Sequence, residues 1–333
     1  YICLPGLLAS GDIQTVSAVE SKTDKNPNIL VILIDDAGYN DFGFMGSKEM
    51  QTPNIDALTS EGVVFTDAHV AATVSSPSRA CLITGRYGHR FGYECNLSDR
   101  TNGLPLEEET IAEVFKTNGY RTAAIGKWHL GSRDEQHPNN RGFDLFYGMK
   151  AGGRDYFYNE KKSDRPGDER NLLLNDRQVK FEKYLTDAFS EKAVEFINES
   201  SQPFMMYLAY NAVHTPMQAT DEDMARFEGH PRQKLAAMTY ALDRGVGTVI
   251  RGLKDSGKFD NTLIFFLSDN GGATTNQSSN YPLKGFKGNK FEGGHRVPYF
   301  VVWKNGIPAG KPYDGLVSSL DIFATAIDAV SYT

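Results

Sequence analysis

The chain has 333 residues, and its 35 Lys and Arg against 42 Asp and Glu give a formal net charge of −7. This length can bury the core of one large domain or of two modest ones. The acidic balance argues against a protein that binds nucleic acid through general positive charge, so we expect no nucleic-acid partner. The 3 cysteines are too few for a disulfide framework. We expect Cys81 to be a small buried residue, although a bridge to Cys95 stays open.

The N-terminal segment is apolar from Tyr1 to Ser10, lacks an initiator Met and continues as a polar stretch to Asn26. This pattern favours the remainder of a signal peptide, although an ordinary N-terminal tail would look the same. No apolar run is long enough to span a membrane. We therefore expect an exported protein, periplasmic or secreted, in which residues 1–26 are signal remnant and tail and residues 27–333 form one domain.

Apolar segments of strand length alternate along the chain with amphipathic segments of helix length. The expected strands cover residues 29–34, 122–125, 204–209, 263–267 and 297–303. The expected helices cover residues 54–62, 109–118, 186–197, 235–253 and 320–330. Gly119 is a natural end for the second helix, and Thr186 is a candidate cap for the third. The alternation predicts an α/β fold with a mostly parallel central sheet flanked by helices, and residues 150–177 are expected to form a long surface loop.

Polar side chains follow every expected strand except the last. They are Asp35 and Asp36, Lys127 and His129, His214, and Asp269 and Asn270. Open α/β sheets bind ligands beyond the carboxyl ends of their strands. We therefore expect these residues, which are distant in sequence, to converge at one edge of the sheet.

Two of these groups have the donor atoms of a metal site. The adjacent carboxylates Asp35 and Asp36 repel each other unless a cation offsets their charge. Asp269 and Asn270 add another carboxylate and a neutral oxygen. Four oxygen donors without a thiolate suit a hard cation such as Ca²⁺ or Mg²⁺. Either pair alone would more simply be solvated residues that close a strand, but two pairs on one sheet favour a metal.

The segment Ser75-Ser76-Pro77-Ser78-Arg79 predicts a tight turn that leads into a helix. Pro77 suits the first helical turn, because its missing N–H would have no partner there. Free backbone N–H groups at a helix start favour an anion, and Arg79 adds a fixed positive charge. The segment therefore places Ser75 where an anion and a nucleophile could meet, although a Ser/Pro turn that caps an ordinary helix has the same pattern.

Further cationic and imidazole side chains lie in three short stretches. Lys127 and His129 share one side of an extended segment. His214 follows a buried strand, and a lone histidine there is more often structural than catalytic. Lys287 lies in a Gly-rich loop, which an ion pair between Glu292 and Arg296 is expected to hold.

The pattern Ser-x-Pro-Ser-Arg, followed by Ala-x-Leu-x-Thr-Gly-Arg from Ala80, resembles the signature of the type I sulfatases, a family of the alkaline phosphatase-like superfamily. In that family the first residue, Cys or Ser, is oxidised to formylglycine. The similarity runs from about Asn28 to Val330 and includes all the stretches above in the same order. It implies a serine-type bacterial member whose Ser75 is oxidised by a maturation enzyme. It also implies that residues 27–333 are the N-terminal catalytic domain, without the smaller C-terminal subdomain that relatives carry.

The resemblance also implies a role for each residue. It places one Ca²⁺ between Asp35, Asp36, Asp269, Asn270 and the modified Ser75. Arg79 would steady the formylglycine hydrate and its charge. Lys127 and Lys287 would bind sulfate oxygens. His129 would assist breakdown of the sulfated intermediate, and His214 would protonate the leaving alcohol.

Sulfate-ester hydrolysis explains why such a set is needed. The ester spreads one negative charge over three oxygens and leaves as a poor alkoxide, so catalysis needs aimed cations, an activated nucleophile and an acid. An unmodified serine is a weak nucleophile and would remain trapped as a stable sulfate ester. A hydrated aldehyde on a metal is better placed, since the metal lowers the pKa of the coordinated hydroxyl.

Polar and aromatic residues in loops near the expected pocket suit sugar hydroxyls, although solvent-facing loops have the same composition. They are Tyr93, Glu94, Asn96, Lys150, Arg154, Asp155 and Tyr156. His295 stands where relatives often have an aliphatic residue, and is either a substrate contact or a packing variant. The stretch 207–214 resembles carbohydrate sulfatases, so we expect a sulfated polysaccharide or glycosaminoglycan fragment as the substrate.

Two other functions stay open. One is a phosphomonoester or phosphonate hydrolase of the same superfamily, which the single metal site and the Ser-x-Pro-Ser-Arg pattern disfavour. The other is an inactive sulfated-glycan-binding protein in which Ser75 is never oxidised. The presence of every expected catalytic residue argues against this second alternative.

Overall fold

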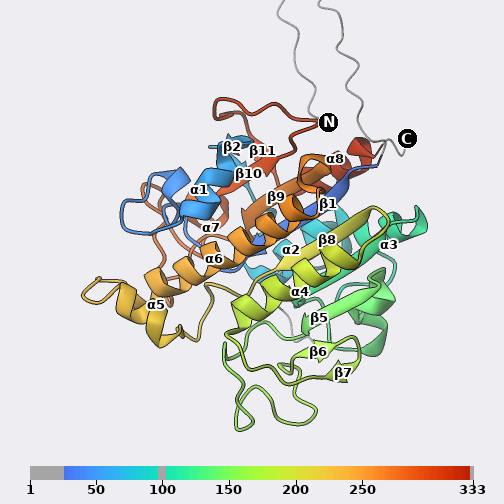
Figure 1. The fold of residues 1–333 in the computed structure, drawn as a ribbon, viewed down its shortest axis with the longest axis horizontal. Coiled ribbons are helices and arrows are strands. Elements are labelled where there is room, and N and C mark those ends of the chain that lie inside the picture. Colours follow the sequence, from blue (N-terminus) through green and yellow to red (C-terminus); the bar gives the residue numbers. More distant parts are fainter. Residues whose placement is uncertain (1–25, 97–102, 331–333) are drawn as a thin grey trace, which may run out of the picture.

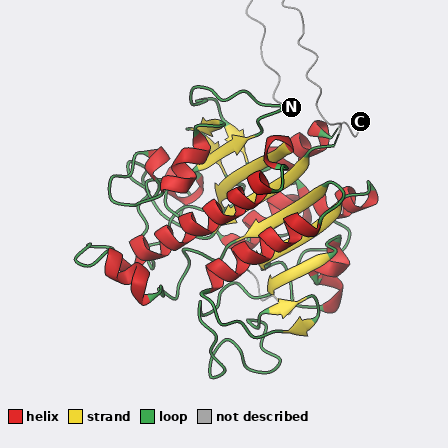
Figure 2. Ribbon diagram, viewed as in Figure 1, coloured by secondary structure: helices red, strands yellow, loops and turns green. Residues whose placement is uncertain are grey.

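In the computed structural model, residues 26–96 and 103–330 are described, and they form three layers with one sheet in the middle (Figures 1 and 2). The strands of this sheet are, in spatial order, β2 (Val63–Phe65), β10 (Tyr299–Val302), β9 (Thr262–Ser268), β1 (Asn28–Ile34), β8 (Phe204–Ala209), β4 (Arg121–Lys127), β5 (Leu145–Met149), β6 (Leu173–Leu174) and β7 (Arg177–Gln178). The strands from β9 to β5 are parallel, and the outer ones are antiparallel. The predicted α/β fold with a mostly parallel sheet is therefore confirmed.

Strand β1 shows why this sheet lies in the middle of the domain. All of its residues are buried. Leu30, Ile32 and Ile34 pack into the core on one face. Ile29 and its alternate neighbours pack into the core on the other face. A strand that is apolar on both sides needs cover on both sides, as parallel sheets generally do.

Helices provide that cover. One face carries α1 (Pro53–Thr59), α4 (Leu185–Glu199) and α6 (Gln233–Asp255), with α5 (Asp221–Arg226) beside α6. The other face carries α2 (Ser75–Thr84), α3 (Ile111–Thr117) and α8 (Asp321–Ala329). The smaller elements are β3 (Ala68–His69), β11 (Val317–Ser318), α7 (Glu292–His295) and the 3-10 turns Gly43–Met45, Gly88–Phe91, Asp134–Gln136, Pro138–Arg141 and Phe259–Asn261. Strands β3 and β11 pair as a separate small sheet.

All the predicted helices and strands exist, and most of their ends agree within two residues. Thr186 is a correction: it lies inside α4, which begins at Leu185 after Tyr184, and its hydroxyl is buried, so it does not cap the helix. Helix α3 starts at Ile111 because Thr110 and Glu113 form a reciprocal capping box. Strand β5 and the short edge strands were not predicted.

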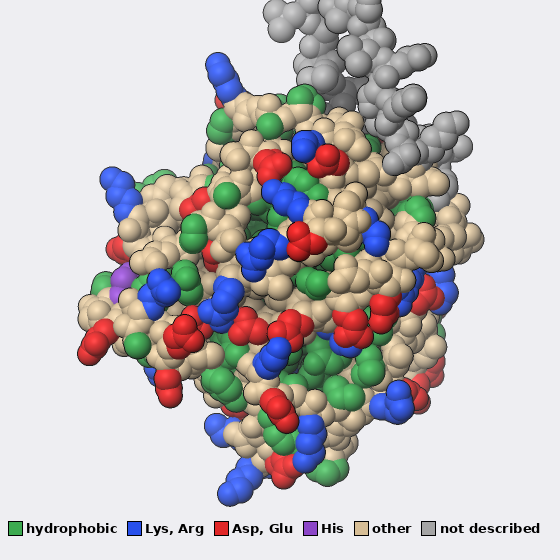
Figure 3. Space-filling model, viewed as in Figure 1, with side chains coloured by type: hydrophobic (Ala, Val, Ile, Leu, Met, Phe, Trp, Pro, Cys, Tyr) green, Lys and Arg blue, Asp and Glu red, His purple; other side chains and the backbone are tan. Residues whose placement is uncertain are grey.

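The cysteines and the predicted loop behave mostly as expected. Cys81 is buried and Cys95 exposed, and both are free thiols, so the open question of a bridge is answered against it. Residues 150–177 form a loop with only the short strand β6 before β7. The segment expected to be a signal remnant lies outside the described residues, apart from Asn26. Among the described residues, no helix combines the length and the hydrophobicity that crossing a membrane requires. On the face drawn in Figure 3, acidic and basic side chains are interspersed.

We expect Gly126→Ala to destabilise the protein by more than about 2 kcal/mol. Gly126 has φ +107° inside β4, and a Cβ atom there would collide with the Ala209 carbonyl of the neighbouring strand. Strained backbone and a clash in a packed sheet each cost roughly 1–3 kcal/mol. Urea unfolding of Gly119→Ala is the matched control, because Gly119 has φ +81° but no neighbour within 4 Å of its Cβ position. If both variants lost the same free energy of unfolding, the sheet must have moved to relieve the clash with the Ala209 carbonyl.

Candidate active site

The carboxyl edge of the sheet brings together residues from five parts of the chain. Asp35 follows β1 directly, Asp269 follows β9, and Lys127 ends β4. His214 lies in the loop after β8, and Ser75 begins α2. The parallel arrangement of β9, β1, β8 and β4 makes these strands end at one edge, which is the usual ligand site of an open α/β sheet.

Ser75 lies at the centre of this group and is buried. Its Oγ lies 3.2 Å from Asp35 Oδ1 and 3.3 Å from Asn270 Oδ1. Lys127 Nζ lies 3.4 Å from the Ser75 Oγ. The hydroxyl therefore lies within hydrogen-bonding distance of two acceptor oxygens and one ammonium group.

Asn96, which we expected to contact substrate, instead supports the start of the Ser75 helix. Its Oδ1 accepts the Ser76 N–H at 2.9 Å. The Ser76 hydroxyl lies 2.6 Å from the Tyr93 hydroxyl and donates to the His129 carbonyl at 2.7 Å. These contacts hold the first turn of α2, where Val74 makes no side-chain cap.

The carboxylates of Asp35, Asp36 and Asp269 are all buried, and each faces a cation. Lys127 Nζ reaches Asp35 Oδ2 at 2.6 Å, and Lys287 Nζ reaches Asp36 Oδ1 at 2.7 Å. Arg79 grips Asp269 Oδ2 through Nε at 3.0 Å and through Nη2 at 2.8 Å. The site thus contains three buried carboxylates and three cations, of which Arg79 and Lys127 are also buried.

Charge decides the protonation of these groups. Burial alone would raise the pKa of Asp35, but the charges of Lys127, His214 and Arg79 outweigh it and lower that pKa. Burial lowers the pKa of Lys127. Burial also opposes the charge of Lys287, but the charges of Asp36, Asp35 and Asp269 together outweigh this effect and raise its pKa. Asp35 is therefore held ionised, as a metal ligand must be.

The oxygen donors fit a hard divalent cation. Asn270 Nδ2 donates to Asp36 Oδ1 at 2.8 Å, which turns Asn270 Oδ1 toward Ser75. Carboxylate and amide oxygens without sulfur are what Ca²⁺ and Mg²⁺ prefer. Carboxylate and imidazole atoms of Asp35, Asp36 and His214 lie within 4.8 Å of one another, close enough to share one ion.

The two histidines are held in defined orientations. His214 Nδ1 lies 2.7 Å from the Thr215 carbonyl and donates to it, so Nε2, 3.7 Å from Asp36 Oδ2, is the nitrogen that remains to exchange a proton. His129 is half-buried, and its backbone N–H donates to the Lys150 carbonyl at 3.0 Å. A Cβ on Gly152 would collide with the His129 ring. The pair Gly152-Gly153 lets the loop approach both imidazoles, a signal that the sequence analysis did not use.

We expect the free energy of unfolding to fall as the pH drops below about 6.5, partly through His129. Burial, then the charges of Lys127 and Arg79, hold the pKa of His129 well below its ordinary value of 6.5. Below pH 6.5 the unfolded chain therefore binds a proton that the folded chain does not. This lowers the free energy of unfolding by up to about 1.4 kcal/mol for each pH unit. Urea unfolding across this range should give a flatter profile for His129→Gln, whereas His89→Gln, at an exposed position, should follow the parent. Parallel profiles for parent and His129→Gln would contradict this.

Arg154 and Asp155, two other residues that we expected to contact the substrate, make contacts inside the protein. Arg154 is buried and binds both carboxylate oxygens of Asp164, at 2.7 and 2.8 Å. Asp155 accepts hydrogen bonds from Ser163 and Gln218. These contacts hold the loop 150–177 together, and the role of the two residues in binding substrate stays a prediction.

Three further residues that we considered as possible substrate contacts also make contacts inside the protein. The Tyr156 hydroxyl shares its one proton between the carbonyls of Asn211 and His214, at 2.6 and 2.8 Å, and so fixes the histidine loop. Lys150 Nζ donates to the Ser132 carbonyl. His295 lies against His69, with their Nδ1 atoms 2.9 Å apart. Glu94 is exposed.

The sequence analysis missed Asn276, which ties the site together. Its Nδ2 donates to the backbone carbonyls of Asp36, at 3.1 Å, and Val213, at 2.9 Å. It therefore joins the loop after β1 to the loop that carries His214. The predicted ion pair between Glu292 and Arg296 is confirmed, at 3.3 Å.

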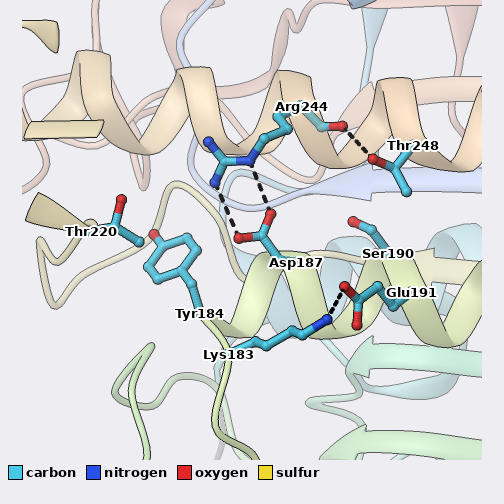
Figure 4. Close-up of a pocket in the computed structure, with 8 residues that line it drawn as sticks. All are labelled: Lys183, Tyr184, Asp187, Ser190, Glu191, Thr220, Arg244 and Thr248. Atoms are coloured by element: carbon cyan, nitrogen blue, oxygen red, sulfur yellow. Dashed lines mark hydrogen bonds and ion pairs between the residues drawn. The ribbon is translucent and has the colours of Figure 1, made fainter. Parts of the chain in front are cut away.

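A second hollow, of about 410 Å³, lies between α4 and α6, away from this site (Figure 4). Arg244 crosses it and pairs with Asp187 at 3.1 Å and with Asp223 at 2.6 Å. Lys183 pairs with Glu191 on the rim. The charged groups that line this hollow are thus paired with one another. The ion pair between Arg244 and Asp187 joins the two helices.

The fold and the site define an α/β protein with a serine at a helix start above a buried pocket of oxygen donors. The chain belongs to the sulfatase family, because the family model described as Sulfatase matches residues 27–332. It is 34% identical to the uncharacterized sulfatase YdeN of Escherichia coli (strain K12) over 93% of this chain and 63% of that protein. It is 33% identical to N-acetylgalactosamine-6-sulfatase of Canis lupus familiaris over 90% of this chain and 62% of that protein.

Solved structures give the same result. Ps i-CgsB, solved in complex with k-i-k-neocarrahexaose, matches with a TM-score of 0.87 and 44% identity, over 92% of this chain and 72% of its own. The PsFucS1 sulfatase from Pseudoalteromonas sp. matches with a TM-score of 0.77 and 27% identity, over 94% of this chain and 69% of its own. The chain thus spans less than two thirds of the curated relatives named above.

Proposed function

We propose that this protein is a sulfuric ester hydrolase that removes O-sulfate groups from a carbohydrate, a sulfated polysaccharide or glycosaminoglycan fragment. The observation that carries this proposal is the position of Ser75. Its Oγ lies within 3.4 Å of Asp35, Asn270 and Lys127 together. A side chain so placed can be oxidised and can bind a metal ion together with Asp35 and Asn270. The ammonium group of Lys127 can attract an anion to it.

The reactive groups that we assign are a formylglycine made from Ser75 and one Ca²⁺ held by Asp35, Asp36, Asp269, Asn270 and that residue. The oxidised side chain supplies a hydrated aldehyde, a better nucleophile than a serine hydroxyl. The cation supplies a charge that lowers the pKa of a bound hydroxyl. The donor set of this site, all oxygen and largely buried, supports this assignment.

The residues around Ser75 can bind and orient a sulfate ester. Lys127 and Lys287 bring ammonium groups to the two carboxylates beside Ser75, close enough for their protons to turn toward sulfate oxygens. Arg79, locked on Asp269, adds a fixed positive field at the helix start. These cations would stabilise the charge that grows on the sulfate group.

Proton transfer falls to the histidines in this proposal. His129 is neutral near pH 7 because its pKa is low, so it can accept a proton. His214 has its Nδ1 committed to the Thr215 carbonyl, so a proton on Nε2 can pass only toward the pocket. We assign His214 as the acid that protonates the leaving alcohol.

Sugar substrates are supported by the similar proteins. Ps i-CgsB was solved with a neocarrahexaose, and other relatives bear the names of glycan sulfatases. We also propose that the protein is exported and meets a maturation enzyme for serine-type sites, since the N-terminal sequence has an apolar segment before its polar tail.

Two measurements test this proposal on protein made in a maturation-competent host. The mass of the tryptic peptide that spans Ser75 should be lower by two hydrogens, partly with one water added back. Paired assays on an aryl sulfate and an aryl phosphate should show turnover of the sulfate. An unmodified Ser75 without turnover, in protein shown to be folded by circular dichroism, would favour a glycan-binding protein. Preference for phosphate would favour a phosphohydrolase.

A further inference from the structure

The loop 281–291 has a composition unlike the rest of this acidic protein. It contains Tyr281, Phe286 and Phe291, which are 73%, 42% and 42% exposed. It also contains Lys284, Lys287 and Lys290, and no acidic residue. Large exposed aromatic side chains that gather on one segment mark a binding surface more often than chance exposure does.

This loop is fixed directly to the candidate active site. The Lys287 N–H donates to the Gly272 carbonyl at 3.1 Å, two residues beyond Asn270. The Gly288 N–H donates to the Thr73 carbonyl at 2.8 Å, two residues before Ser75. A rigid loop pays little conformational entropy when a ligand covers it, so its rings form a pre-organised surface.

Asn280 fixes the start of the same loop. Its Oδ1 accepts the Gly272 N–H at 2.8 Å, and its Nδ2 donates to the carbonyls of Gly272, at 3.0 Å, and Gly285, at 3.2 Å. The side chain is buried although the residue next to it is the most exposed large aromatic of the described chain. The exposure of Tyr281 is therefore built into the loop rather than a result of fraying.

The lysines of the loop divide into two groups. Lys287 points inward and pairs with Asp36 at 2.7 Å. Lys284 and Lys290 are exposed, and neither has a carboxylate within 4.0 Å among the described residues. The Lys284 ammonium instead lies 4.2 Å from the centre of the Phe291 ring. One lysine thus serves the reactive centre, and two remain for an anion outside it.

We propose that the loop 281–291 is a second substrate subsite, on which sugar rings next to the sulfated sugar stack. Tyr281 and Phe286 present flat apolar faces that suit the C–H faces of pyranose rings. Lys284 and Lys290 pair with further sulfate groups of the same glycan. This inference rests on the proposed function, and it makes the substrate an oligosaccharide with sulfates on more than one sugar.

Binding in the Ser75→Ala background, where no turnover occurs, tests the subsite. The probes are a carrageenan hexasaccharide and the corresponding disaccharide, titrated by calorimetry. We expect the hexasaccharide to bind roughly 10-fold more tightly, and Tyr281→Ala or Phe286→Ala to remove most of this difference. Phe286→Tyr should retain it. Tyr313→Leu is the matched control, since Tyr313 is also 42% exposed but lies outside the loop.

Charge gives a second readout. Lys284→Gln with Lys290→Gln should weaken the salt dependence of hexasaccharide binding, whereas Lys254→Gln on α6 should not. Equal affinity for the two sugars, or loop variants that bind like the parent, would overturn the subsite even if the matured enzyme hydrolyses an aryl sulfate. Conversely, length-dependent binding that the loop variants abolish would support it even if no sulfate ester were hydrolysed, an outcome that would reject the proposed function alone.

Discussion

Ser75→Ala is expected to lower the kcat for sulfate-ester hydrolysis by about 10⁴-fold or more, because it removes the group that attacks. The folded state should change little. The Ser75 Oγ makes only long contacts, of 3.2 to 3.4 Å, and their loss costs about 1 kcal/mol. The measurement is kcat and KM on an aryl sulfate, with urea unfolding of the same samples.

Two variants serve as controls for this result. Ser75→Cys should regain activity in a host that matures cysteine-type sites, since the family signature accepts either residue. Ser76→Ala loses the contacts to Tyr93 and the His129 carbonyl but keeps the attacking group, so its loss should be much smaller. Residual activity in Ser75→Ala within a factor of ten of the parent would show that another residue is the nucleophile.

Asp269→Ala is expected to destabilise the protein by about 3–5 kcal/mol and to abolish activity. It leaves Arg79 buried with only Asp35 Oδ1 nearby, at 3.7 Å, and a buried charge that loses its hydrogen-bonded carboxylate carries a penalty of this size. Arg79 cannot escape by losing its proton, because a guanidinium group stays protonated in proteins. Unfolding by urea should be measured with a chelator present, so that loss of a metal ligand does not contribute.

Two comparisons separate the buried charge from other effects. Asp269→Asn keeps the shape and one acceptor oxygen, and should cost less than Asp269→Ala. Glu160→Ala breaks an exposed pair with Lys180, which is worth under about 1 kcal/mol. If Asp269→Ala were as stable as Glu160→Ala, water must reach Arg79 and the site is more open than the structure shows.

Local patterns predicted the framework of the fold well. The strand Phe204–Ala209 was predicted at its observed bounds, because a run of apolar residues between polar ones is itself the signal of a buried strand. Thr186 was assigned wrongly because several residues before a helix can cap it, and packing of Tyr184 and Leu185 chose an earlier start. Strand β5 was missed because its pairing with β4 lies outside its own sequence.

For the site, residues at strand ends were predictable and their partners were not. The sequence indicated Asp35, Lys127 and Asp269 as neighbours, since parallel strands end together. It gave no means to foresee that Arg154 would turn inward to Asp164, or that Asn96 would hold the Ser76 N–H. Such contacts depend on how two loops fold against each other.

The sequence by itself determined the α/β class and the identity of the residues around Ser75, because hydrophobic periodicity and short motifs are properties of neighbouring residues. Only the tertiary structure decided which cation faces which carboxylate and which way the loop 281–291 presents its rings. Those features depend on contacts between segments far apart in the chain, such as Lys287 with Asp36, and burial fixes their energies only once the segments have met.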